Sequence, residues 1–291
     1  MRIGSILAVW VVLTFGVSGC AGLTRSKAES TIARALISDG QEAQLGRQVR
    51  GELAKKGVAY VTNTEVTEYV REISEKLLPG ARRDRPGVRW QVDVIDDAKT
   101  VNAFATPGGY LYVYTGLLLA AENEAEVAGV LGHEMAHVVA RHSARQMVTT
   151  YGLQTVLGIA LGNQPHMLAQ LGTSIAANGY LLANSRGDET ESDELGAKYA
   201  SAAGYDPRGI ASFFERLSAR EGGSPGFMKW LSTHPPSAER VTHIERFIAE
   251  RRLSGSLTAP ERLQAIQAKV RALKPAAPTP ASPSSPSPAQ F

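Results

Sequence analysis

Residues 133–137 read His-Glu-Met-Ala-His, and this pentapeptide is the part of the chain best suited to chemistry. On a helix, side chains four residues apart share one face, so His133 and His137 can bind a single metal ion. Glu134 then lies about 100° further round the helix, where a carboxylate can accept a proton from metal-bound water. The pentapeptide therefore predicts zinc-assisted hydrolysis, with peptide bonds as the expected substrate.

The residues around the pentapeptide predict a long, largely buried helix over Glu122–Arg141. Its apolar side chains recur at helical spacing and are Val127, Val130, Leu131, Met135, Val138 and Val139. Acidic residues begin the segment and Arg141 ends it, as the helix macrodipole favours. Such an element holds metal ligands rigidly. The alternative is that His133 and His137 are core imidazoles bonded to backbone carbonyls.

The N-terminus has the pattern of an export signal. Arg2 precedes an uncharged apolar stretch, and Val17–Cys20 reads Val-Ser-Gly-Cys, which resembles a bacterial lipoprotein box. Cys20 is the only cysteine, so it cannot form an internal disulfide, whereas a lipid on its sulfur explains its presence. We expect a signal peptide over residues 1–19 and lipidation of Cys20. A plain N-terminal anchor helix is the alternative.

Location, charge and domain organisation follow from the same features. Ala21 stands where enteric lipoproteins retained in the inner membrane carry Asp, which favours the outer membrane and the periplasmic face.

The formal net charge of +3 predicts neither a nucleic acid nor an acidic partner. The expected parts after the signal peptide are a tether over 20–40, a catalytic domain over 41–255, a helix over 256–273 and a disordered Pro/Ala/Ser tail over 274–291.

The globular part predicts an α+β domain dominated by helix. Helical periodicity covers 42–56 and 64–78, alternation predicts a strand over 88–94, and 111–114 follows a Gly-Gly turn as another strand. Asn102–Thr106 is expected to be extended, because Pro107 disfavours helix at the residue before it. These elements predict a small antiparallel sheet packed on the active-site helix.

The segment Gln146–Ser185 contains no Asp, Glu, Lys or Arg. Asn163-Gln164-Pro165 divides it into two apolar pieces, each short for a bilayer span. One interpretation is two buried helices of a soluble core. The other is a hydrophobic flap that rests on a bilayer or over the active site.

A catalytic zinc needs a third protein ligand. One class of site uses a His six residues after the second, with a Gly midway, but Ser143 and Ala140 occupy those positions. His142 lies about 140° round the helix from His137, so we interpret it as a surface or helix-end residue. A carboxylate from a second helix is the other solution, and Ser185–Asp193 offers several acids.

At this point the sequence resembles the zinc metallopeptidase family that includes HtpX and the CAAX prenyl proteases, in particular its soluble periplasmic lipoprotein branch. That family joins H-E-x-x-H to a downstream S-R-x-x-E-x-x-A-D, which matches Ser185–Asp193 except for Ser192 in place of Ala. The resemblance implies a zincin-like fold of the gluzincin type, one Zn²⁺ per chain and Glu189 as third ligand. It also implies that Asp193 orients a ligand His. From spacing alone, Glu191 or Glu194 could bind instead.

Two further motifs of the family are matched, and the resemblance covers roughly residues 40–250. Asn102–Gly109 resembles the segment before the metal helix, and its residues Asn102, Ala103, Phe104 and Ala105 are expected to pair with an extended substrate. Ser232–Pro235 resembles a late His-Pro motif. His234 is then either a donor to the oxyanion of the reaction or a fourth ligand that blocks the site.

The remaining polar residues have simpler interpretations. Arg240 is expected to pair with an acid near the His234 loop, and His166 and His243 are taken as structural. The expected function is a zinc endopeptidase that cleaves unfolded or misfolded cell-envelope proteins. The alternative is a lipid-anchored chaperone or assembly factor with a latent or structural zinc site. An esterase or amidase is disfavoured, because nothing predicts a dedicated small pocket.

Overall fold

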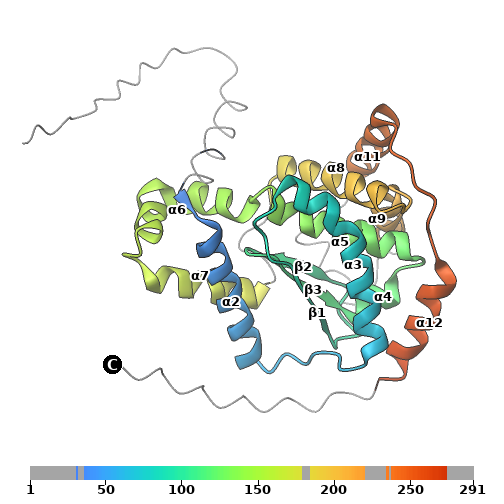
Figure 1. Cartoon of the computed structure of the whole chain (residues 1–291), viewed down its shortest axis with the longest axis horizontal. Helices are drawn as coiled ribbons and strands as arrows, with labels where there is room; N and C mark the ends of the chain where they lie inside the picture. The colour runs from blue at the N-terminus through green and yellow to red at the C-terminus, as the bar shows by residue number, and fades with distance from the viewer. Residues whose placement is uncertain (1–30, 32–35, 179–183, 220–233, 236, 274–291) are drawn as a thin grey trace, which may run out of the picture.

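The computed structural model describes residues 31, 36–178, 184–219, 234, 235 and 237–273 (Figure 1). The predicted signal peptide, Cys20, most of the tether and the Pro/Ala/Ser tail lie outside these residues. Ile37 is buried and helix α2 begins at Asp39, so the folded domain starts within the last residues of the range 20–40.

A three-stranded sheet lies at the centre, with strands β1 (Gln91–Ile95), β2 (Ala103–Thr106) and β3 (Tyr110–Tyr114) in the order β1-β3-β2. β2 and β3 are antiparallel, and Gly108 and Gly109 take positive φ in the turn between them, where a side chain would be strained. β1 pairs with β3 in parallel, so the sheet is mixed and the expectation of a purely antiparallel sheet was wrong. The chain reverses on each side of β2, which makes β1 and β3 run the same way.

Helices cover both faces of this sheet. They are α2 (Asp39–Lys55), α3 (Thr64–Asp84), α4 (Thr115–Ala120), α5 (Glu124–Val139), α6 (His142–Ala160), α7 (Pro165–Asn178), α8 (Arg186–Ala202), α9 (Gly209–Ala219), α11 (Ala238–Arg251) and α12 (Pro260–Arg271). The expectation of a mostly helical α+β domain is confirmed.

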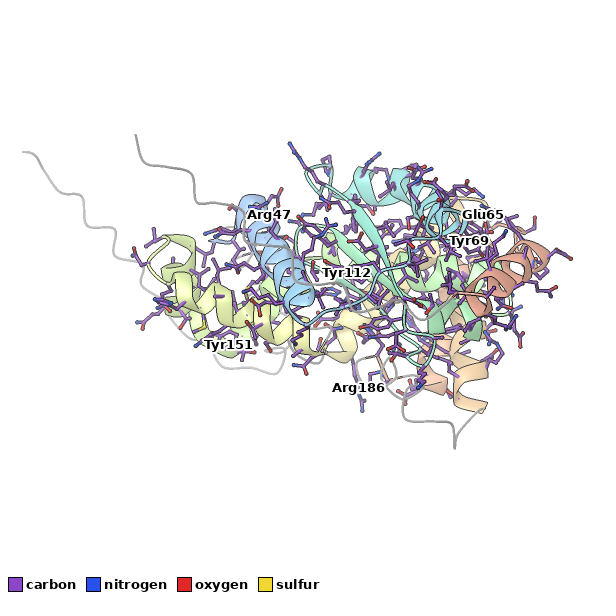
Figure 2. The ribbon with its side chains drawn as sticks, turned by 90° about the horizontal axis from the view of Figure 1, so that it is seen from below. Arg47, Glu65, Tyr69, Tyr112, Tyr151 and Arg186 are labelled. Carbon is purple, nitrogen blue, oxygen red and sulfur yellow. The ribbon has the colours of Figure 1, made fainter. Side chains whose placement is uncertain are left out.

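Alternation along β3 divides the core into two parts. Leu111 and Val113 pack with α3, α5, α8 and α9, while Tyr110, Tyr112 and Tyr114 pack with α2, α6 and α7. Figure 1 shows α2, α6 and α7 grouped at one end of the molecule and α8, α9, α11 and α12 gathered towards the other. In the view of Figure 2, Tyr112 of β3 lies between Tyr151 of α6 and Tyr69 of α3.

The charge-free segment forms two helices, α6 and α7, separated where Asn163-Gln164-Pro165 was expected to break it. Buried residues of both, including Val156, Ile159 and Leu171, belong to the core beneath α2. Among the described residues, no helix combines the length and apolarity needed to cross a membrane.

Candidate active site

Helix α5 carries the pentapeptide through the middle of the molecule. Asn123 caps its first turn by accepting a hydrogen bond from the backbone N–H of Glu126, and nearly every residue of the helix is buried. His133 and His137 project from one face, with their Nε2 atoms 3.0 Å apart. The helical spacing therefore brings both imidazoles to one point.

Helix α8 crosses α5 closely enough to bring the downstream acids to the same point. Ser185 and Asp188 form a reciprocal capping box that fixes where α8 begins. Gly132 and Gly196 allow the close approach, because a Cβ on Gly196 would lie 2.9 Å from the backbone N of His133. With only hydrogen atoms between the helices, the side chains of Glu189 and Asp193 reach the histidines.

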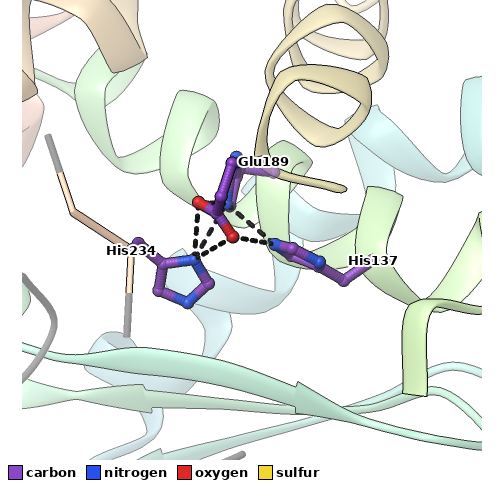
Figure 3. Close-up of side chains that lie close together, drawn as sticks. His137, Glu189 and His234 are labelled. Atoms are coloured by element: carbon purple, nitrogen blue, oxygen red, sulfur yellow. Dashed lines mark hydrogen bonds and ion pairs between the residues drawn. The ribbon is translucent and has the colours of Figure 1, made fainter. Parts of the chain in front are cut away.

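Four buried side chains converge there: His133, His137, Glu189 and His234. Figure 3 labels the last three. A Glu189 oxygen lies 3.5 Å from His133 Nε2, and the other lies 3.4 Å from His137 Nε2. His234 Nδ1 lies 3.1 Å from His133 Nε2 and 3.1 Å from each Glu189 oxygen. The structure thus brings together the three residues expected to bind zinc and adds His234.

These separations fit a tetrahedral zinc site. Bonds of about 2.0–2.1 Å from a central ion to four donor atoms give donor–donor separations of roughly 3.3 Å. The separations given above lie between 3.0 and 3.5 Å, and all four donor atoms lie within 4.8 Å of one another. Three imidazoles and one carboxylate are also donors that zinc prefers. The residues present therefore suit a zinc ion.

The charges at the site point the same way. Burial raises the pKa of Glu189, but His234, His133 and His137 outweigh it and hold that pKa far below its usual range. Burial lowers the pKa of His133, yet hydrogen bonds to Asp193 and Glu189 raise it to about 9. Buried carboxylates thus demand a positive charge here, which a metal ion can supply in place of protons.

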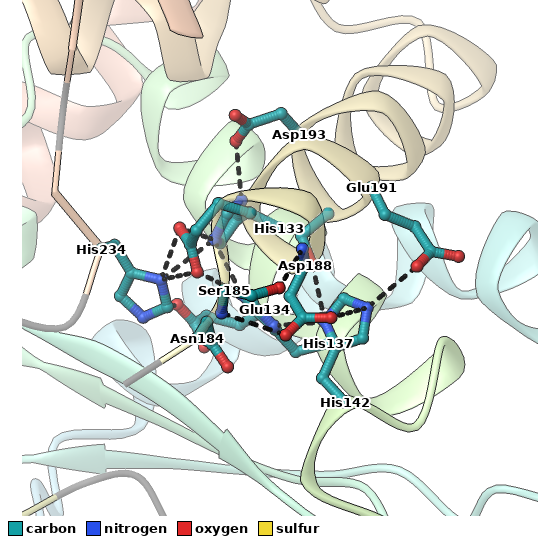
Figure 4. Close-up of polar contacts among 12 residues, drawn as sticks. His133, Glu134, His137, His142, Asn184, Ser185, Asp188, Glu191, Asp193 and His234 are labelled. Carbon is teal, nitrogen blue, oxygen red and sulfur yellow. Dashed lines mark hydrogen bonds and ion pairs between the residues drawn. The ribbon is translucent and has the colours of Figure 1, made fainter. Parts of the chain in front are cut away.

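Asp193 holds His133 from the side away from the cluster (Figure 4). His133 Nδ1 lies 2.9 Å from Asp193 Oδ1, so His133 keeps Nε2 for the cluster when Nδ1 donates to the carboxylate. Arg240 donates from Nε and Nη2 to the two Asp193 oxygens, both at 2.8 Å, and its Nη1 lies 3.0 Å from Glu189. The acids that Arg240 was expected to meet are therefore Asp193 and Glu189.

Glu134 lies beside the four convergent groups and touches the sheet. Its Oε2 accepts a hydrogen bond of 3.3 Å from the backbone N–H of Ala105 in β2, and its Oε1 lies 3.3 Å from His234 Nε2. β2 is the edge strand next to α5, and Phe104 stacks on Tyr112 with ring centroids 4.8 Å apart. Glu134 therefore stands between the cluster and edge strand β2, in which only Ala105 is partly exposed.

His142 was wrongly interpreted as a surface or helix-end residue pointing elsewhere. It is 1% exposed, and its Nδ1 lies 2.7 Å from Nδ1 of His137. Helix α5 ends at Val139, and Arg141 takes a left-handed conformation with φ of 61°, so His142 does not continue the α5 spiral. Hydrogen bonds from Arg141 to Glu42 and Ile37 hold this bend. A left-handed residue is usually a glycine, so the arginine at this position gives no sign of the bend in the sequence.

The contact between His137 and His142 determines which ring nitrogen of His137 carries the proton. Since Nε2 of His137 faces the cluster, its Nδ1 carries the proton and donates to His142. His142 then donates from Nε2 to Glu191, 3.2 Å away, and Arg145 binds the same carboxylate at 3.0 Å. Figure 4 shows this second support running from Glu191 through His142 to His137.

The alternative ligands and the other histidines are placed outside the cluster. Glu191 is engaged with His142 and Arg145, and Glu194 binds His243 at 2.9 Å. His166 lies exposed on α7. Glu189 is therefore the acid of α8 that joins the histidines.

Comparisons with known proteins agree with this geometry. Residues 64–248 match the model of peptidase family M48. The metalloprotease LoiP of Escherichia coli is 33% identical over 84% of this chain and 96% of its own length. The mitochondrial metalloendopeptidase OMA1 of Schizosaccharomyces pombe is 35% identical over 63% of this chain. The β-barrel assembly-enhancing protease of Escherichia coli is 28% identical over 72% of this chain.

The chain matches only 53% and 44% of the last two relatives, whereas it matches nearly all of LoiP. The family match covers well over half of the chain and includes all four convergent residues. The chain therefore belongs to peptidase family M48, and it is a metallopeptidase that uses zinc.

Proposed function

We propose that this protein is an endopeptidase of the bacterial cell envelope, which cleaves unfolded or misfolded proteins at the site formed by α5 and α8. The observation that carries the proposal is the convergence of His133, His137 and Glu189 beside Glu134. The relative named a β-barrel assembly-enhancing protease supports a role in the quality control of envelope proteins.

The reaction can be assigned to this chain's own residues. Zinc, when held by His133, His137 and Glu189, supplies a Lewis acid that polarises the scissile carbonyl and acidifies water. Glu134 accepts the proton of the attacking water and returns it to the leaving amine nitrogen. The hydrogen bond from Ala105 keeps this carboxylate at the edge of β2, where the scissile bond has to lie.

Strand β2 is the proposed substrate-binding edge. Hydrogen bonding alternates along an antiparallel strand, so the backbone groups of Ala103 and Ala105 face away from β3 while those of Phe104 and Thr106 face towards it. The N–H of Ala105 is bonded to Glu134, and an extended chain can pair with the other outward groups irrespective of its side chains. Such binding selects extended substrates, and unfolded proteins supply them.

Replacement of the base tests the assignment. Glu134→Gln preserves shape and zinc but removes proton transfer, so we expect cleavage of denatured casein to fall by about 10²–10⁴-fold. Glu194→Gln is the matched control, because Glu194 binds His243 outside the cluster. A chelator should stop cleavage by both the natural protein and the control. Cleavage by Glu134→Gln at the natural rate would refute the assigned base.

The position of His234 supports the alternative of a latent zinc site, in which a fourth protein ligand blocks the reaction. His234 Nδ1 lies among the other donor atoms, and its Nε2 lies 3.3 Å from Glu134. We propose that in this arrangement His234 fills the position that water and substrate need. His234→Ala should then cleave faster than the natural protein. Slower cleavage would instead favour the role of His234 as an oxyanion donor.

We also propose that the protein is exported and lipidated on Cys20, and that it faces the periplasm from the outer membrane. The lipoprotein box and the single cysteine support this proposal. Mass spectrometry of the purified N-terminus tests it directly. A chain that begins at Cys20 and carries acyl chains is expected, and an unmodified thiol would contradict the proposal.

A further inference from the structure

Three leucines form an exposed stripe along the last turns of α6 and the residue that caps it, Leu161. Leu153, Leu157 and Leu161 are 44%, 36% and 72% exposed. They are spaced four residues apart and therefore lie along one face of the helix. Single exposed leucines are common on protein surfaces, but an aligned set needs an explanation. Within the described part of the chain, only Leu257 is another large apolar side chain exposed to this degree.

The chain segment that contains this leucine stripe lacks acidic residues, Lys and Arg. The 40-residue segment Gln146–Ser185 lacks Asp, Glu, Lys and Arg altogether, and His166 on α7 is its one ionisable side chain apart from Tyr. The exposed polar side chains nearest the leucines in sequence include the neutral amides of Gln154 and Asn163. Contact of these leucines with hydrocarbon would therefore desolvate no Asp, Glu, Lys or Arg of residues 146–178. The same absence removes any electrostatic attraction to anionic lipids, on which basic amphipathic helices depend.

The N-terminal end of the domain lies beside the stripe. The side chain of Gln41, in the first turn of α2, donates hydrogen bonds of 3.1 and 3.0 Å to the carbonyls of Ile159 and Ala160. Leu161, the most exposed leucine, follows directly. Only residues 21–37 separate Cys20 from Ser38, the N-cap of α2. A lipid on Cys20 would therefore hold this part of the domain, rather than the far end with α11 and α12, near a bilayer (Figure 1).

We propose that the leucine stripe is a second membrane contact, which inserts Leu153, Leu157 and Leu161 into the apolar outer part of a lipid bilayer. The role of the stripe in orienting the domain depends on the lipid proposed for Cys20. The two contacts together fix the α6–α7 end against the membrane and leave the opposite end, with α11 and α12, in the periplasm. The stripe alone adds a weak affinity that does not depend on lipid charge.

Vesicle flotation measures this affinity without the lipid. The protein is the zinc-loaded mature chain from residue 20 with Cys20→Ser, and the vesicles are uncharged phosphatidylcholine. The exposed fractions of the three leucines sum to about one and a half side chains, so replacing all three by Gln should lower the partition coefficient by on the order of 50-fold. Leu257→Gln is the matched control, because Leu257 and Leu157 are each 36% exposed.

Partition of the Cys20→Ser chain and of the Leu257→Gln control should be equal. Neither added anionic lipid nor salt should change it, because residues 146–178, which include the stripe, contain no Asp, Glu, Lys or Arg. Equal partition by the triple variant would overturn the proposal. A second result would also overturn it: the Cys20→Ser chain does not bind vesicles but forms a dimer, and the triple variant is a monomer. The stripe would then bind a second copy of the chain.

A second measurement covers the case in which the triple variant fails to fold. In the Cys20→Ser chain, Leu157→Cys and Leu257→Cys each give a single thiol for an environment-sensitive fluorophore. Vesicles should shift the emission to the blue only at position 157, and no shift there would overturn the proposal. Casein cleavage in solution reports separately on the proposed protease, because the leucines lie outside the catalytic residues. Loss of all cleavage with intact flotation would refute the protease alone.

Discussion

His142 gives the sharpest test of how the site is organised. The proposal is that its imidazole fixes the tautomer and orientation of His137 through the 2.7 Å contact between their Nδ1 atoms. His142→Ala should leave the proton on His137 Nδ1 without a partner in a site where the His137 side chain is only 10% exposed. An unpaired buried donor costs about 1–3 kcal/mol, which corresponds to roughly 10- to 100-fold in the dissociation constant for zinc.

The assay is zinc affinity by competition with a chromophoric chelator, together with the melting temperature of the metal-free protein. His142→Asn is the matched rescue, because its amide oxygen can lie near the position of Nδ1 and accept from His137. We expect Asn to recover most of the affinity that Ala loses. His243→Ala is the control for loss of an imidazole outside the site, since His243 contacts Glu194, Arg246 and Phe247, none of which belongs to the site. A folded His142→Ala protein with zinc affinity within twofold of the natural chain would refute the reasoning.

Two further predictions concern the packing and the metal. Gly196→Ala should destabilise the protein by about 1–3 kcal/mol and weaken zinc binding, because the new Cβ would lie 2.9 Å from the backbone N of His133. Gly51→Ala in α2 should instead stabilise the protein by up to about 1 kcal/mol, since nothing lies within 4 Å of the added methyl. Urea unfolding measures the stability of both variants. Equal midpoints for the two variants would contradict the close packing of α5 and α8. Removal of zinc should lower the melting temperature, because Glu189 and the histidines then lose the ion that they bind together. An unchanged melting temperature in calorimetry would argue against a metal in the folded protein.

Local patterns in the sequence were enough to predict the parts of the site that lie on one element. His133, Glu134 and His137 share a helix, so their relation depends only on helical geometry. Glu189 lies far along the chain on another helix, and spacing alone could not separate it from Glu191 and Glu194. The resemblance to a family supplied that choice, and the capping box at Ser185 shows why α8 presents Glu189 in its first turn.

The features missed from sequence depend on contacts between distant segments. The left-handed turn at Arg141 redirects His142, and it is held by Glu42 and Ile37, which lie about a hundred residues earlier. Likewise, alternation predicted β1 as a strand but could not tell which strand it pairs with. Neither result follows from local periodicity, because each is decided by tertiary hydrogen bonds.

The central claim is that His133, His137 and Glu189 hold one zinc ion with His234 beside them. Elemental analysis and X-ray absorption of the purified protein test it most directly. The account predicts one zinc per chain, bound by nitrogen and oxygen donors at about 2.0–2.2 Å, with loss of the metal in His133→Ala. A protein that takes up no zinc, or a His133→Ala variant that keeps its zinc in full, would contradict it.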